Sequence, residues 1–219
     1  MKRYNLRINN VLRKEFCAIR SKLDIIIFLL KTMQYISSFP YEELIYSSSN
    51  PSKVDIVINV DKMSRIFYCE QDKIHTFQFP FLINIENEKF KLSYKDRDID
   101  NELIAIILSI LEREIEAFES LEAVVDIFLG TMHDFGVTNN YYSNYCWDII
   151  MFLLMFEPGY IRYDYDNTEG RVDSIKHPLN HLDFFYSSNN TFKIGLNDRF
   201  DHEKLIKLVD INDKCTYLK

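Results

Sequence analysis

The sequence predicts an α+β fold in which antiparallel β regions pack with long helices. Apolar residues recur at spacings of three and four in residues 10–37 and 101–118, which is typical of amphipathic helices. Between them, residues 54–94 alternate with a period of two and are rich in β-branched and aromatic residues, which favours short antiparallel strands. With only 5 Gly and 5 Pro, the 219-residue chain has little room for long irregular loops.

Local signals define the elements of the N-terminal part. Asn9 or Asn10 can cap the helix over residues 10–37, and Pro40 ends it. We interpret the basic residues that precede and open this helix as its solvated start rather than as a phosphate or lipid contact. In the meander that follows, Pro80 separates two strands or lies at an edge.

A second helical part follows the meander. Asp98 or Asp100 caps the helix over residues 101–118, which continues or kinks as far as Gly130, where a glycine can stop it. Residues 143–156 are apolar nearly all round, and this pattern predicts the central buried helix.

The C-terminal part is predicted to form three strands and a final helix, at residues 160–166, 181–187, 191–196 and 200–210. No Gly-rich linker marks a domain boundary. We therefore expect a single α+β domain over residues 1–219. Its sub-regions are 1–140, with a helix and a β meander, and 141–219, with a helix, a three-stranded sheet and a terminal helix.

Charge, cysteine spacing and hydropathy exclude several classes of protein. The formal charge of -7 and the pI of about 5.3 disfavour a stand-alone nucleic-acid binder. Four cysteines without CxxC spacing disfavour a zinc ribbon or a disulfide framework and favour a reducing cytosol. The apolar runs at residues 23–30 and 147–156 are too short to cross a bilayer, and the N-terminus lacks a signal-peptide pattern. We expect a cytoplasmic protein without a membrane partner.

The three C-terminal strands carry many polar side chains. Because successive residues of a strand point to opposite faces, one surface of their sheet collects polar residues from all three strands. They are Arg162, Asp164, Asp166, His181, Asp183 and Lys193. Tyr163 belongs to the apolar set on the other face.

Two interpretations of this surface stay open. In the first, it is the solvated face of an ordinary sheet, with cross-strand ion pairs of about 0.2–1 kcal/mol each. In the second, it is a catalytic site where histidine transfers protons near neutral pH and an arginine grips a phosphate or carboxylate. Its candidates are Arg162, Asp164, His177 and His181. The spacing of His177 and His181 suits metal ligands only on a helix, which Pro178 disfavours, so we expect no metal and no cofactor.

The same region carries a resemblance. Three short motifs resemble the C-terminal part of an uncharacterised bacterial family. They are R-Y-D-Y-D at residues 162–166, H-P-x-x-H-L at 177–182 and F-K-I-G-L at 192–196. Its members are often found in phage-defence and mobile-element neighbourhoods. The core is also similar to that of small TumE-type toxins, which are suspected to act on RNA. The likeness covers about 45 of the 219 residues and matches Arg162, Tyr163, Asp164, His177, Pro178 and His181. The toxins tend to have a further histidine where this chain has Asp183.

Three functions compete on these grounds. We favour, by a small margin, an accessory subunit of a bacterial anti-phage defence system that binds other protein subunits, because the chain is acidic and rich in tyrosines suited to interfaces. A metal-dependent nuclease using Asp164, Asp166 and Asp183 ranks last.

The main alternative is a metal-independent ribonuclease or toxin with RNA as its partner. RNA cleavage through the 2′-hydroxyl needs only acid–base catalysis and charge stabilisation. His181 and His177 would exchange protons in this alternative. Arg162 and Lys193 would clamp the phosphate, and Asp164 would orient a histidine. The remaining polar residues, Asp183 and Asp166, and Tyr163 would contribute to binding.

Overall fold

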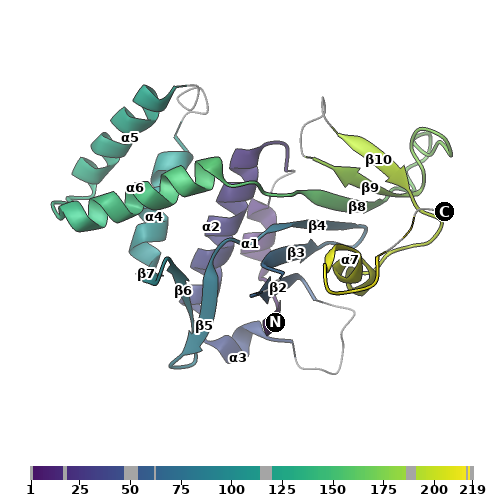
Figure 1. Cartoon of the computed structure of the whole chain (residues 1–219), viewed down its shortest axis with the longest axis horizontal. Coiled ribbons are helices and arrows are strands. Elements are labelled where there is room, and N and C mark those ends of the chain that lie inside the picture. Colours follow the sequence, from purple (N-terminus) through teal and green to yellow (C-terminus); the bar gives the residue numbers. More distant parts are fainter. Residues whose placement is uncertain are drawn as a thin grey trace. The chain divides into compact units, whose positions relative to one another are not determined.

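The computed structural model of the chain describes residues 2–16, 19–46, 54–61, 63–113, 120–185, 191–215 and 217. These residues form seven helices and ten strands in two antiparallel sheets, which confirms the predicted α+β class (Figure 1). The chain divides into two compact units. Unit 1 consists of Met1–Ile8, Ile45–Pro80 and Pro158–Lys219, and unit 2 of Asn9–Leu44 and Phe81–Glu157. None of the helices in these described residues is long and apolar enough to cross a membrane.

Unit 1 is built on a seven-stranded antiparallel sheet of order β1-β2-β3-β4-β8-β9-β10 (Figure 1). The strands are β1 (Lys2–Leu6), β2 (Ile56–Val60), β3 (Arg65–Cys69), β4 (Lys73–Gln78), β8 (Ile161–Tyr165), β9 (Asn180–Phe184) and β10 (Phe192–Gly195). Only the first part of the predicted meander, β2–β4, joins the C-terminal strands in one sheet, because β8 pairs with β4, with Ile74 opposite Tyr163. The rest of the meander forms a separate sheet. The basic segment is only partly the helix start that we expected: Arg13 and Lys14 lie in the first helix, which begins at Asn10, but Lys2 and Arg3 lie in β1, which pairs with β2.

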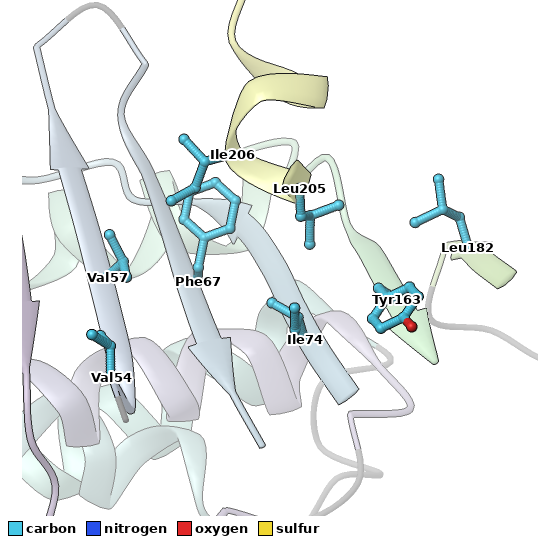
Figure 2. Packing of buried hydrophobic residues seen from close by; sticks show 8 residues of the cluster. All are labelled: Val54, Val57, Phe67, Ile74, Tyr163, Leu182, Leu205 and Ile206. Atoms are coloured by element: carbon cyan, nitrogen blue, oxygen red, sulfur yellow. The ribbon is translucent and has the colours of Figure 1, made fainter. Parts of the chain in front are cut away.

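Helix α7 (His202–Val209) packs on one face of this sheet and confirms the predicted final helix. Asp201 caps α7 by accepting a hydrogen bond from the Lys204 amide. Leu205 and Ile206 of α7 lie beside Phe67 of β3 (Figure 2). The buried cluster consists of Val54, Val57, Phe67, Ile74, Tyr163, Leu182, Leu205 and Ile206. This face of the sheet is thus a closed apolar core.

The opposite face of the same sheet is apolar in one part and polar in another. At one end of β2, β3 and β4 it is apolar, with Ile58, Ile66 and Phe77 paired in register and fully buried. On β8, β9 and β10 the same face carries charged and histidine side chains. The candidate site therefore continues the buried side of a sheet.

A salt bridge ties β1 to α7 and yields a pH-dependent prediction. Arg3 Nη2 lies 2.6 Å from Glu203 Oε1, and this hydrogen bond lowers the pKa of the Glu203 carboxyl. A lowered carboxyl pKa contributes stability above the pKa of the unfolded chain, and that stability is lost as the pH falls through the folded pKa. Because Glu203 is 46% exposed, we expect Arg3→Gln to cost only about 0.5 kcal/mol at pH 7.

Urea unfolding of both proteins tests this pair. The difference in unfolding free energy should shrink as the pH is lowered to about 3, below the ordinary glutamate pKa. An equal difference at both pH values would show that Arg3 acts through packing instead of charge.

Unit 2 packs helices against a small three-stranded sheet of order β5-β6-β7. Its helices are α1 (Asn10–Glu15), α2 (Lys22–Ser38), α3 (Tyr41–Leu44), α4 (Asn101–Leu111), α5 (Leu121–Asp134) and α6 (Asn140–Met155). Its strands are β5 (Leu82–Glu86), β6 (Lys89–Tyr94) and β7 (Arg97–Ile99). Positive φ angles at Asn87–Glu88 and Lys95–Asp96 form the two tight turns of this meander. Pro80 separates β4 from β5 as predicted.

The predicted helix over residues 10–37 is two helices. Asn9 caps α1, and a new cap at Ser21 opens α2. Ser21 Oγ accepts from the Asp24 amide while the Asp24 carboxylate accepts from the Ser21 amide, which is a complete capping box. These local hydrogen bonds define the start of a second helix, which the regular spacing of apolar residues in the sequence does not reveal.

Two predictions for the later helices are wrong. Gly130 does not stop α5, which begins after the Ser120 cap and continues to Asp134. Helix α6 buries only one face, and its Met155 is 71% exposed, so it is not the central helix. Asp100 does cap α4, which ends at Leu111. Residues 114–119 of the helix expected here lie outside the described residues.

Candidate functional site

The candidate site is a group of five side chains on β8, β9 and β10, which we call the polar cluster: Arg162, Asp164, His181, Asp183 and Lys193. Asp164, His181 and Asp183 are buried, while Arg162 and Lys193 are partly exposed. The strand register brings them together. Asp183 lies opposite both Arg162 and Lys193, and Asp164 lies opposite His181. The predicted convergence of these residues on one face is confirmed.

The cluster is not the solvated sheet face that one interpretation expected. The exposed fraction is 0% for His181, 3% for Asp183 and 6% for Asp164. Buried charges are costly unless they are paired and hydrogen-bonded. The chain therefore has to balance these charges within the cluster.

Arg162 supplies most of this balance. Its Nε and Nη2 atoms donate to the two carboxylate oxygens of Asp164 at 2.8 and 2.7 Å, and Nη2 also donates to Asp183 Oδ2 at 2.5 Å. Burial alone would raise the pKa of the Asp164 carboxyl, but the hydrogen bonds and the positive charge of Arg162 outweigh burial and hold that pKa well below its usual range. Arg162 is thus occupied by two carboxylates rather than presented to a phosphate.

His181 is held in one tautomer. Its Nδ1 lies 2.7 Å from the Pro178 carbonyl oxygen, which can only accept, so Nδ1 carries the hydrogen. Nε2 then has a free lone pair and accepts from Lys193 Nζ at 3.0 Å. Lys193 Nζ also donates to Asp183 Oδ1 at 2.6 Å.

Gly195 leaves room for the proline whose carbonyl fixes this tautomer. It lies opposite His181 in β10, and a Cβ at this position would come within 3.0 Å of Pro178 Cγ. A side chain would therefore push the Pro178 ring away. The role of Gly195 escaped the sequence analysis, although its place in the predicted strand is a signal that could have revealed it.

The structure separates three predicted site residues from the cluster. His177 packs its ring at 4.7 Å from the His181 ring, and its Nε2 lies 3.9 Å from Asp166 Oδ2. Asp166 accepts from the Thr168 amide and stabilises a turn after β8. Tyr163 faces the α7 side of the sheet and donates to Asn180 Oδ1. His177 thus reaches the flank of His181, while Asp166 and Tyr163 do not join the polar cluster.

His75 is a site neighbour that the sequence analysis missed, because a single histidine in a predicted strand carries no signal of its distant partners. It is buried on β4 directly opposite Arg162. Its Nδ1 lies 3.1 Å from the Tyr160 hydroxyl, and burial raises the pKa of Tyr160 to about 12. On its other side, hydrogen bonding with His75 lowers the pKa of Glu70. The polar face therefore extends across β4 as well.

Comparisons with known proteins add no assignment: no protein-family model matches the chain, and neither a curated protein nor a solved structure does. The chemistry of the cluster follows from its geometry. Three of its residues could hold a metal ion, because one ligand atom each from Asp164, His181 and Asp183 lies within 4.8 Å of the others.

Proposed function

We propose that the protein is a non-catalytic interaction subunit. The observation that supports this role is an exposed apolar row on α5. Leu121 and Leu129 are 60% and 58% exposed, and the partly buried Val125 lies midway between them on the same helix face. The other face of α5 is buried through Val124 and Phe128. Exposed apolar rows of this kind are typical of helices that bind a groove on another protein.

The charge beside this row defines the partner further. Glu122 and Asp126 are exposed and adjacent to the apolar residues along the helix. An apolar groove with a basic rim would complement both features. The C-terminal strands resemble the bacterial family that is often found in phage-defence neighbourhoods. This resemblance supports placing the protein and its partner in the cytoplasm, as parts of a bacterial anti-phage defence system.

The state of the polar cluster counts against the ribonuclease alternative. That mechanism needs Arg162 and Lys193 on a phosphate and His181 on a ribose hydroxyl. Arg162 and Lys193 are instead paired with buried aspartates, and the His181 side chain has no exposed surface. A subunit needs none of these groups to be free.

Expression of the protein alone tests this choice. Under a tight inducible promoter we expect no growth arrest and no RNA cleavage in bacteria. Arrest that His181→Ala relieves at equal protein level would overturn the interaction role and identify a toxin.

Substitution on α5 tests the interface itself. We expect the tagged protein to co-purify in a fixed ratio with the product of a gene flanking its own. Leu121→Asp with Leu129→Asp should abolish this, because two charges cannot enter an apolar groove without a cost of several kcal/mol. The complete gene cluster should then lose its protection in a phage-plating assay.

Met155→Asp is the matched control, since Met155 is an exposed apolar residue on α6 of the same unit. This variant should keep both co-purification and protection. If the α5 double variant also keeps them, or if the wild-type protein binds no flanking gene product, the proposal is wrong.

A further inference from the structure

The polar cluster combines three ligand atoms of the types that bind metals. His181 Nε2 lies 3.6 Å from Asp164 Oδ2 and 3.8 Å from Asp183 Oδ1. Two ligands on one tetrahedral zinc ion are separated by about 3.4 Å, given metal–ligand bonds of about 2.1 Å. Closing these two gaps takes shifts of a few tenths of an ångström, and all three ligand atoms lie within 4.8 Å of one another.

The His181 imidazole already has the hydrogen bonding that is typical of a metal ligand. Metal-bound histidines almost always donate their second ring N–H to a carbonyl or carboxylate, which fixes the tautomer and directs the other nitrogen to the ion. His181 shows this arrangement, with Nδ1 on the Pro178 oxygen and Nε2 toward the two aspartates. Gly195 leaves the space that this arrangement requires.

A cation already contacts two of the three ligands. Lys193 Nζ contacts His181 Nε2 at 3.0 Å and Asp183 Oδ1 at 2.6 Å. Lys193 lies on the edge strand β10, and its side chain is partly exposed. Its long flexible stem can therefore move the ammonium out to solvent and leave the ligands in place.

From these contacts we propose that Asp164, His181 and Asp183 form a binding site for a divalent transition-metal ion, with Lys193 as the displaceable cation. The mixed nitrogen and oxygen set fits Zn²⁺ or Mn²⁺ better than Ca²⁺ or Mg²⁺, which prefer oxygen ligands alone. This site is independent of the α5 interface and goes beyond the interaction role.

The charge balance of the cluster gives a specific expectation. Arg162 neutralises one of the two carboxylates, and Lys193 neutralises the other. Metal binding must therefore compete with the ammonium. Removal of the ammonium leaves an uncompensated buried negative charge, which a metal ion would satisfy.

Calorimetric titration of the chelator-treated full-length protein with Zn²⁺ and with Mn²⁺ tests the proposal. We expect one ion per chain. Lys193→Gln should tighten binding by about tenfold or more, because it removes the competing cation. A misfolded variant cannot produce this gain, so the result is separable from loss of structure.

His181→Gln should weaken binding by more than about 100-fold, since it removes a direct ligand. His133→Gln is the matched control, because His133 is 92% exposed on α5 and is remote in sequence from the cluster. The proposal is overturned if the wild-type protein binds neither ion, if Lys193→Gln leaves the affinity unchanged, or if His133→Gln weakens binding as much as His181→Gln does. The α5 experiment is unaffected by any of these outcomes.

Discussion

Replacing Arg162 by alanine is expected to destabilise unit 1 by about 3–5 kcal/mol, because it leaves two buried carboxylates with only one strong partner. Asp164 loses both of its hydrogen bonds from the guanidinium, and Asp183 keeps only its hydrogen bond from Lys193. Small domains have total stabilities of about 5–15 kcal/mol, so the loss is a large fraction of the whole. Urea unfolding at pH 7 measures it directly.

Two further variants separate the net value of the cluster from the cost of breaking it. Arg162→Lys keeps the positive charge but not the bidentate contact with Asp164. Its decrease in the free energy of unfolding should therefore be intermediate. A triple replacement, Arg162→Met with Asp164→Leu and Asp183→Leu, should be close to neutral, because apolar residues of similar volume need no pairing. A loss of under about 1 kcal/mol for Arg162→Ala would mean that water replaces the guanidinium.

The second large effect is expected on the other face of the sheet. Leu205→Ala should reduce the free energy of unfolding by about 2–5 kcal/mol, since it opens a cavity between α7 and the sheet. Leu205 is fully buried in the cluster that includes Phe67 (Figure 2). Thermal and urea unfolding both report this change.

Lys207→Ala provides the control within the same helix. Lys207 is exposed in the last turn of α7, so its replacement should change stability by no more than about 0.5 kcal/mol. Equal losses for Leu205→Ala and Lys207→Ala would show that α7 is stabilised by helix propensity and not by packing.

The features predictable from sequence are those with a local physical cause. The period of two in residues 160–166 and 181–187 is set by strand geometry, and it assigned Arg162 and Asp183 to one face correctly. The Asp100 cap followed from hydrogen bonding within one helical turn. Such signals need no knowledge of distant residues.

The features that escaped prediction depend on distant pairing. Polar and apolar residues alternate along β8 and β9 in the same way whether the polar face is exposed to solvent or buried. The burial of His181 could therefore not be inferred from the sequence. The same applies to His75, which joins the polar face only because β4 pairs with β8. A single apolar period also concealed the break at Ser21.

The pairing of β4 with β8 has a consequence for biosynthesis. Thr76 and Ile161 are partners in the sheet but are 85 residues apart along the chain. At about 5–20 residues per second, the ribosome takes about 4–17 s to deliver β8 after β4, and the unit 2 segment Phe81–Glu157 emerges in between. Until then β4 has an unpaired edge in the nascent chain, which is the stage most open to misassembly or to a chaperone. A C-terminal fragment from Pro158 would contain all five residues of the polar cluster but would lack β4, the pairing partner of β8.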